Sequence, residues 1–420
     1  MRLLSGSRFF ILITNGKKEK NRRGVGELNN FIFENTTKVF FGEGCVREYL
    51  RCLIKHYEGT VMFAHGGGSG RENGIYEEVM CLLAQADRTV TEFSGIMSNP
   101  TYEKVLEGAR LARKNSVGLI LGVGGDSVMD CCKAVSLAAR YDGDAWEEFW
   151  ARPGIVDFEP LPVGVIITAV GTGSECNGSA VITNEALKIK TGRDYPRCNP
   201  KFALLDPTYT YGVPKSQMVS GSFDILSHIM EAYFSGPDED NVSDDIAEAL
   251  MRNVIRNLRA AVSNPQDYTA RSNLMWDAVM AKNRIIRLGK RTDFTCHQME
   301  YQLDAYTGCS HGAGLAALHP AYYRHIYRDG IEKFKRFAMN VWGISAEGRS
   351  SEEIACAGIA ALEDFIREIG LPTTLRELGV DEKTDLKKIA DSCAISQGGY
   401  RKLSHEEILE IFRECYIGNF

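Results

Sequence analysis

Several absences in the sequence exclude broad classes of protein. No apolar run approaches the roughly 18 residues that a membrane helix needs, so we expect no membrane span. The chain has no long basic block and a formal net charge of -6, which argues against nucleic acid and anionic membranes as partners. What remains is an ordinary globular composition, with 44% hydrophobic and 25% charged residues.

The twelve cysteines also lack a framework pattern. None lies in a C-x-x-C pair, zinc-finger spacing is absent, and only Cys131 and Cys132 are adjacent. We interpret them as reduced thiols rather than disulfide partners, which predicts a cytoplasmic protein.

The first 25 residues lack the features of a signal peptide. Their short apolar core, 9–13, is followed by a basic tract, without a longer apolar region or a clear small-residue cleavage site. We predict that residues 1–25 are a disordered extension outside the fold.

The remainder divides into two regions with different patterns. From 26 to 213, short β-branched and aromatic runs alternate with amphipathic segments at 74–86 and 101–115, which predicts an α/β domain with a parallel sheet. From 214 to 420 the segments, among them 270–287, are helical by period and length, which predicts an all-helical second domain. The expected strands are 60–65, 90–95, 117–123, 163–169 and 201–206.

Two glycine-rich loops follow expected strands. "HGGGSG" (65–70) and "GVGGDSVMD" (122–130) expose backbone N–H groups, and the second opens into a helix whose N-terminus favours phosphate. Neither matches G-x-G-x-x-G or a Walker loop, so each alone is more simply a tight turn. Two such loops at strand ends of one sheet favour Rossmann-like dinucleotide binding. A third segment, "ITAVGTGSECN" (167–177), presents hydroxyls to a phosphate or nicotinamide, or is a packed turn.

Histidine is scarce, with eight in the chain, yet five lie between 228 and 325. Asp224 and His228 share one helical face at a spacing of four residues, and His297 and His311 follow on later segments. One carboxylate and three imidazoles suit a first-row divalent ion with an open coordination position. From the residues alone, a hydrogen-bonded Asp–His pair and core histidines remain the alternative.

Taken together, these motifs resemble the iron-containing (group III) alcohol dehydrogenase family, in particular its butanol dehydrogenase branch. The four candidate ligands match the family's metal positions in order, and the likeness extends from about residue 26 to the C-terminus. The resemblance implies a dehydroquinate synthase-like fold, with a dinucleotide-binding domain, a helical metal-binding domain and a cleft between them. The segments that carry it are "VMFAHGGGSGRENGIYEEV", "SNPTYEKVLEGARLAR", "GVGGDSVMDCCK", "GTGSE" and "LDPTYTYGVP".

The resemblance also implies an activity and a set of site residues. The activity is that of a metal-dependent, NAD(P)-dependent dehydrogenase for short primary alcohols and aldehydes such as butanol and butyraldehyde, in a cytoplasmic homodimer. The implied metal is Fe²⁺, or alternatively Zn²⁺. Because Ser69 and Arg71 stand where an acidic residue would favour NAD, we predict that NADPH is accepted. The implied cofactor-binding residues are Gly67, Gly68, Ser69, Asn99, Gly124, Gly125, Asp126, Ser127, Thr168, Thr172 and Lys190.

Three residues depart from the family pattern. Asp126 replaces a glycine and places a carboxylate near the cofactor phosphates, so weaker cofactor binding is expected. Arg284 replaces a glycine and is expected to fill or charge the substrate pocket. Tyr301 replaces a histidine four residues after His297 and is the candidate catalytic residue for proton transfer.

The residues leave two other functions open. A lyase of the dehydroquinate synthase type would need a cluster of cationic side chains, at which Arg284, Arg287, Lys290 and Arg291 hint. A non-catalytic homologue that binds nucleotide and metal would be consistent with the three departures. The four-ligand pattern favours the dehydrogenase over both.

Overall fold

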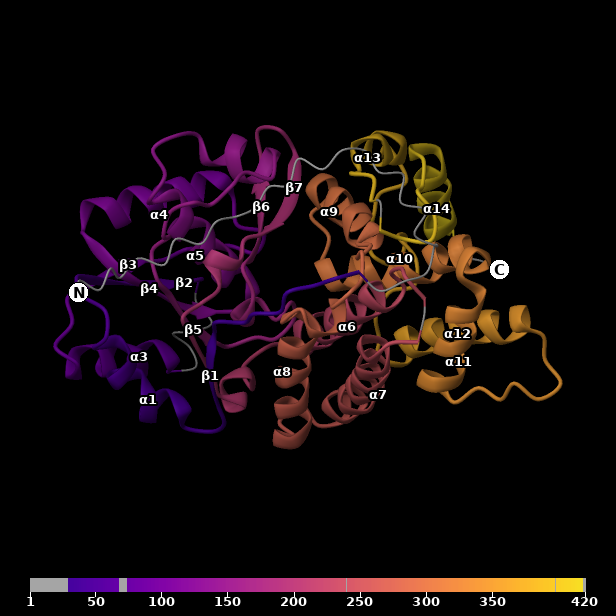
Figure 1. Cartoon of the computed structure of the whole chain (residues 1–420), viewed down its shortest axis with the longest axis horizontal. Coiled ribbons are helices and arrows are strands. Elements are labelled where there is room, and N and C mark those ends of the chain that lie inside the picture. The colour runs from indigo at the N-terminus through magenta and orange to yellow at the C-terminus, as the bar shows by residue number, and fades with distance from the viewer. Residues whose placement is uncertain (1–28, 68–73, 239, 397, 418–420) are drawn as a thin grey trace, which may run out of the picture.

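The computed structural model describes residues 29–67, 74–238, 240–396 and 398–417 of the chain. The extension expected at residues 1–25 lies outside these described residues. Two halves lie side by side in Figure 1, with the strands and indigo-to-magenta helices in one half and the orange and yellow helices in the other. The expected combination of an α/β half and a helical half is therefore confirmed.

A six-stranded parallel sheet forms the centre of the α/β half. Its strand order is β1-β8-β5-β4-β2-β3, and in the central pair Ile120 is in register with Val163. All five residues of β5 are buried, as expected for a strand covered on both faces. The strands are β1 (Lys38–Phe41), β2 (Thr60–His65), β3 (Val90–Phe93), β4 (Val117–Gly124), β5 (Val163–Ile167) and β8 (Phe202–Leu205).

Alternate residues of the strands contact different helical layers. Val61 and Phe63 of β2 belong to the apolar cluster that includes α1 (Cys45–Ile54) and α3 (Ile75–Gln85). Met62 and Ala64 belong instead to the cluster with α4 (Tyr102–Lys114) and α5 (Asp126–Ala138). Because successive side chains of a strand point to opposite faces, this division places one helix pair on each face of the sheet.

A two-stranded antiparallel hairpin, absent from the sequence prediction, follows β5. It consists of β6 (Ser179–Asn184) and β7 (Ile189–Asp194), with β6 packed against α5 and β7 against α9 of the helical half. Neither strand alternates cleanly between apolar and polar residues, so the period-two signal that marks a half-buried strand is weak here. The hairpin carries Lys190 and Asp194 toward the second half of the molecule.

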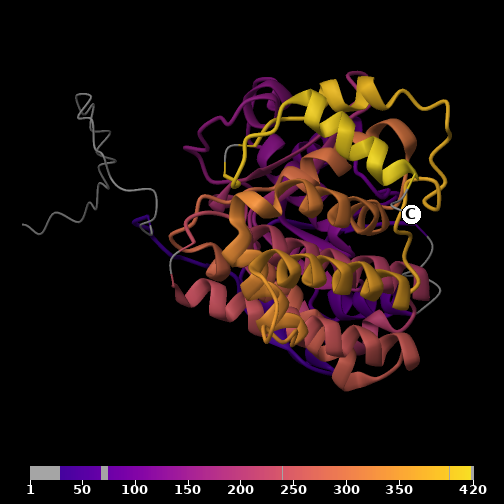
Figure 2. The ribbon, with the colours of Figure 1, turned by 90° about the vertical axis from the view of Figure 1, so that its right-hand side faces the viewer.

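Helix α6 (Lys215–Tyr233) forms the centre of the helical half. From Met218 to Tyr233 every residue except Gly221 is buried, so this helix is covered on all sides by its neighbours. Figure 2, which faces this half, shows the orange and yellow helices in front of the indigo and purple elements. The other helices are α7 (Val242–Ser263), α8 (Tyr268–Lys282), α9 (Thr295–Thr307), α10 (His311–Ile326), α11 (Ile331–Trp342), α12 (Ser351–Glu368), α13 (Leu386–Ser392) and α14 (His405–Ile417).

The change from sheet to helices falls between Leu205, where β8 ends, and Lys215, where α6 begins. Among the described residues, no helix combines the length and the apolar character needed to cross a membrane.

Candidate active site

A cavity of about 1000 Å³ lies between the two halves. From the α/β half it is lined by the carboxyl ends of β2 and β4 and by the loops that follow β3 and β5. From the helical half it is lined by residues of α6, α9 and α10, including Asp224 and His311. Its size and mixed lining are typical of a cofactor and substrate site.

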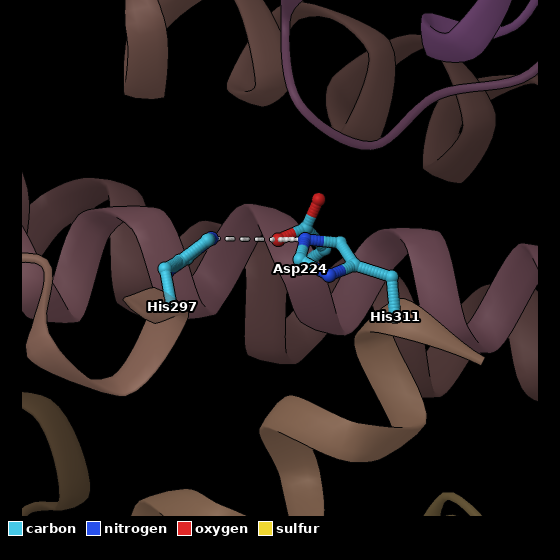
Figure 3. Close-up of side chains that lie close together, drawn as sticks. All are labelled: Asp224, His297 and His311. Atoms are coloured by element: carbon cyan, nitrogen blue, oxygen red, sulfur yellow. Dashed lines mark ion pairs between the residues drawn. The ribbon is translucent and has the colours of Figure 1, made fainter. Parts of the chain in front are cut away.

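Three side chains from separate helices converge at the helical wall of this cavity. Asp224 of α6, His297 of α9 and His311 of α10 each offer a ligand atom, and these atoms all lie within 4.8 Å of one another. Asp224 Oδ1 lies 3.4 Å from His297 Nε2 and 3.6 Å from His311 Nε2. Figure 3 shows the two imidazoles approaching the carboxylate from different sides.

Two of the facing atoms lack a hydrogen-bond partner among the described residues. They are Asp224 Oδ1 and His297 Nε2, and both are buried. A buried polar atom left unpaired costs about 1–3 kcal/mol, so a cluster that leaves two such atoms facing each other fits a bound cation. Carboxylate oxygen with imidazole nitrogen is a donor set that suits Fe²⁺ and Zn²⁺ alike.

Two further carboxylates hold the imidazole rings in position. Glu231 of α6 is hydrogen-bonded to Nδ1 of His297, and Glu300 of α9 is hydrogen-bonded to Nδ1 of His311. With each Nδ1 engaged, Nε2 is left to face Asp224, and carboxylate partners of this kind fix the tautomer of metal-binding histidines. Sequence reasoning missed both residues. The available signal was a His-x-x-Glu spacing, which occurs at 228–231 and again at 297–300.

His228, the fourth expected ligand, lies beside this group rather than within it. Its Nδ1 lies 2.9 Å from the backbone carbonyl of Asp224 and 3.0 Å from Asp224 Oδ1, and its ring centroid lies 4.3 Å from that of His297. The structure thus brings three of the four expected ligands into mutual reach and holds the fourth against them.

The protonation of the cluster follows from burial and from its internal charges. Burial by itself raises the pKa of Asp224, but the adjacent His228 and His311 outweigh it and hold that pKa well below its ordinary value. Burial lowers the pKa of His228 well below its ordinary value. For His297, burial acts downward, yet Glu231 and Asp224 raise the pKa to about 9. The cluster therefore has one carboxylate that stays ionised and is available to a cation.

The second glycine loop forms a close backbone cradle on the opposite wall. It connects β4 to α5, and Gly124, Gly125, Asp126 and Ser127 all line the cavity. A Cβ atom on Gly124 would lie 2.6 Å from a methyl carbon of Val128, so a side chain here would collide with the following helix. The loop opens directly into the N-terminus of α5, where free N–H groups and the helix dipole favour phosphate.

Asp126 connects the cradle to the hydroxyl-bearing segment. The backbone N–H of Thr172 donates to Asp126 Oδ2 at 2.8 Å, while Asp126 Oδ1 is buried without a hydrogen-bond partner among the residues that the structure describes. Burial raises the pKa of Asp126 to about 6, although the hydrogen bond from Thr172 acts in the opposite direction. Asp126 therefore makes a structural contact with Thr172 in addition to carrying the charge that was expected from the sequence.

The other expected cofactor residues are distributed around the same cavity. Thr168, Thr172, Gly67 and Asn99 line it, whereas Gly68 and Ser69 lie outside the described residues. Lys190 also lines the cavity and donates to Asp304 Oδ2 at 2.5 Å.

Tyr301 packs directly against the histidine cluster. Its ring is stacked on His311, with centroids 5.8 Å apart and planes inclined by 23°, and meets His297 edge-on. It lines the cavity, and burial raises the pKa of its hydroxyl well above the ordinary value. The phenol therefore stays protonated at neutral pH and is a hydrogen-bond donor rather than a titrating base.

Arg284 takes a different position from the one expected. Helix α8 ends at Lys282, five residues before the expected boundary, and Arg284 adopts a left-handed backbone conformation with φ of 79°. Its guanidinium forms a bidentate ion pair with Asp194 of β7, at 2.6 and 3.1 Å. Arg284 does not line the cavity, whereas Lys282 and Arg287 on either side of it do.

The chain matches two models of one protein family, which together span most of its length. Residues 36–207 match the iron-containing alcohol dehydrogenase model, and residues 218–416 match the Fe-containing alcohol dehydrogenase family, C-terminal model. The boundary between the two matches falls where the structure changes from sheet to helices.

Named relatives align over nearly the whole chain. The chain is 38% identical to NADH-dependent butanol dehydrogenase A of Clostridium acetobutylicum, over 92% of this chain and 100% of that protein. It is 33% identical to the NADPH-dependent aldehyde reductase YqhD of Escherichia coli, over 93% of this chain and 99% of that protein. The crystal structure of NADH-dependent butanol dehydrogenase A from Thermotoga maritima superimposes with a TM-score of 0.87 at 35% identity, covering 93% of this chain and 100% of the other. The chain belongs to the iron-containing alcohol dehydrogenase family.

Proposed function

We propose that this protein reversibly reduces short aldehydes to primary alcohols with a nicotinamide cofactor, in the cavity between its two halves. The observation that carries the proposal is the convergence of Asp224, His297 and His311 on the wall opposite the glycine cradle. The butanol dehydrogenases and the aldehyde reductase among its relatives supply the substrate class.

Asp224, His297 and His311 would hold the metal, with His228 as the fourth ligand. The unpartnered Asp224 Oδ1 and His297 Nε2 support this assignment. When bound, Fe²⁺ or Zn²⁺ supplies Lewis-acid polarisation of the substrate oxygen, and the nicotinamide supplies or accepts the hydride.

The chain's own residues position the reactants and supply a proton donor. The backbone around Gly124 and Gly125 would bind the pyrophosphate, while Thr168 and Thr172 would flank the nicotinamide half. Tyr301, protonated and next to His311, would donate a hydrogen bond to the group that gains a proton as the aldehyde is reduced. The position between two halves would limit the access of water to the reacting atoms.

We also propose that NADPH is accepted as well as NADH. The first glycine loop carries Ser69 and Arg71 where an acidic residue would favour NAD, so a 2′-phosphate can be accommodated. Relatives with either preference support a cofactor choice that varies within the family.

We further propose that the protein is a cytoplasmic homodimer, with domains at 26–213 and 214–420. All twelve cysteines are free, which supports a reducing compartment. Light scattering after size-exclusion chromatography tests the dimer directly.

The central experiment is a turnover panel of two- to six-carbon aldehydes with NADH and NADPH, with and without added Fe²⁺ or Zn²⁺. Metal-dependent oxidation of the cofactor with butyraldehyde is the expected result. Absence of turnover with every aldehyde and metal would contradict the proposal and favour a non-catalytic homologue. Lyase activity of the dehydroquinate synthase type is disfavoured by the family relationship, although Arg287 of the expected cationic cluster does line the cavity.

A further inference from the structure

Two cationic side chains that line the cavity near the histidine cluster have no acidic partner of their own among the described residues. Lys282, at the end of α8, forms no hydrogen bond or ion pair within the part of the chain that the structure describes. Arg287 also lines the cavity, and its buried Nε and one buried Nη nitrogen have no hydrogen-bond partner in the part of the chain that the structure describes. A buried guanidinium usually satisfies its donors with carboxylates or carbonyls, so these two residues leave positive charge and donor capacity unused.

Both cations lie next to the histidine cluster, on the ring of Phe294. The Lys282 ammonium lies 5.3 Å and the Arg287 guanidinium 4.6 Å from the centre of that ring. The same ring lies 6.0 Å from the His228 ring and 5.4 Å from the His297 ring. A small molecule that reaches the cluster at one end is therefore close to the two cations along its length.

The nearby carboxylates are already engaged by other groups. Asp194 is paired with Arg284, and Glu231 is hydrogen-bonded to His297. Asp224 faces three histidines, and Asp130 accepts hydrogen bonds from Ser174 and the backbone of Val181. None of these carboxylates forms an ion pair with Lys282 or Arg287 among the described residues, so their charges are only partly offset.

The energetic consequence appears in the protonation of the lysine. Burial, together with the adjacent positive charge of Arg287, lowers the pKa of Lys282 to about 7. Burial likewise lowers the pKa of Arg287. Two like charges in a partly closed cavity repel each other, and an anion placed between them would relieve both the repulsion and the unpaired donors.

We propose that the preferred substrate is a short aldehyde whose far end carries a carboxylate, bound by Lys282 and Arg287. This inference rests on the proposed aldehyde reduction and adds the chemical class of the substrate. A planar carboxylate matches the fork of the Arg287 guanidinium, and Lys282 adds a second charge. An aldehyde with a purely aliphatic end would leave both cations unneutralised in the cavity.

The test compares succinic semialdehyde with butyraldehyde, which has the same number of carbons but no carboxylate, in the iron-loaded enzyme. The expected wild-type kcat/KM is higher for succinic semialdehyde. Removing one charged partner costs roughly 10- to 100-fold, so Arg287→Met should lower the ratio of the two kcat/KM values by that factor. Lys282→Met should lower it as well, and Arg287→Lys should restore part of it.

Arg291→Met provides the matched control. Arg291 is an exposed cation four residues further along the same connection and does not line the cavity. The substitution removes the same charge, and the ratio of the two kcat/KM values should stay within about twofold of wild type because an exposed charge is largely screened.

A binding measurement without metal separates this inference from the proposed function. Titration calorimetry of butyrate into metal-free protein with NAD bound should show affinity that falls roughly tenfold or more in Arg287→Met and Lys282→Met. If butyraldehyde is reduced at least as efficiently as succinic semialdehyde and neither substitution changes the ratio, the carboxylate site is refuted while aldehyde reduction stands. If neither aldehyde reacts, the proposed function fails, and unchanged butyrate affinity in both variants would refute the anion site independently.

Discussion

The two walls of the cavity present different chemical groups to a ligand: the α/β wall presents backbone groups, whereas the helical wall presents side chains. On the α/β side, the connection from β4 to α5 offers backbone N–H groups and a helix N-terminus. On the helical side, Asp224, His297 and His311 converge as side chains, and Glu231 and Glu300 hold two of the rings. A backbone cradle survives most side-chain changes that leave it room, whereas a cluster depends on every member. Substitutions on the helical wall should therefore have the larger effects.

The largest effect is expected from removing a ligand of the cluster. His311→Ala should lose bound iron together with more than about a hundredfold of kcat/KM, because outer partners of metal ligands alone account for roughly 10- to 100-fold. Metal analysis and butyraldehyde-dependent cofactor oxidation measure the two losses. His325→Ala is the control, since His325 lies on the same helix α10 but pairs with Glu407. Full iron occupancy in His311→Ala would refute the ligand assignment.

The carboxylates behind the rings should have the next largest effect. Glu300→Gln keeps an acceptor for His311 Nδ1 but removes the negative charge that supports it. We expect iron affinity to fall roughly 10- to 100-fold, as measured by competition with a chelator. Glu363→Gln, which removes an equal charge from a carboxylate paired with Arg324, should leave the affinity unchanged. Equal affinities in both variants would show that Glu300 only packs beside the cluster.

Tyr301 tests whether the helical wall supplies a proton donor as well as ligands. Tyr301→Phe removes the hydroxyl and should slow both reaction directions about tenfold, the loss expected from one hydrogen bond, while iron remains bound. Burial raises the pKa of the Tyr301 hydroxyl far above neutrality. The hydroxyl should therefore stay protonated, and the wild-type pH–rate profile should show no effect of its ionisation between pH 6 and about 9. Superimposable rates and profiles for the two proteins would mean that Tyr301 only packs the wall and that water carries the proton.

The smallest effect is expected on the backbone wall, at Asp126. Its pKa of about 6 means that the carboxyl is neutral well below pH 6 and charged above it, where it repels the cofactor phosphates. Wild-type affinity for NADPH should therefore tighten as pH falls through about 6. Asp126→Asn retains an acceptor for the Thr172 N–H and should bind NADPH about fivefold more tightly at pH 7.5, from roughly 1 kcal/mol of relieved repulsion.

Comparison of the two pH profiles provides the decisive control for Asp126. The Asn variant should lose the wild-type dependence around pH 6, because it has no group to titrate at this position. Weaker NADPH binding in Asp126→Asn would show that the contact with Thr172 outweighs the charge, and that the backbone wall also depends on a side chain.

Local patterns were sufficient for most of the architecture. The five expected strands are all present in the sheet, because continuous apolar β-branched runs such as 117–123 and 163–167 are typical of strands buried on both faces. The four-residue edge strand β1 was not predicted. The hairpin 179–194 was missed because its strands are mixed in polarity and are stabilised by packing against α5 and α9. The helix over 268–282 was expected to continue to 287. It ends earlier because Arg284 adopts a left-handed conformation, and the sequence has no glycine at this position to indicate such a break.

The sequence by itself determined the sheet-then-helices order and the glycine loops at strand ends, because these depend on neighbours along the chain. It singled out Asp224, His228, His297 and His311 as candidate ligands only together with the family resemblance. Only the tertiary structure decided that Glu231 of α6 orients His297 of α9, or that Glu300 orients His311. It also decided that Arg284 pairs with Asp194 while Lys282 and Arg287 face the cavity. These contacts join segments up to 90 residues apart, and such pairings are set by how whole helices and strands pack, which no local pattern encodes.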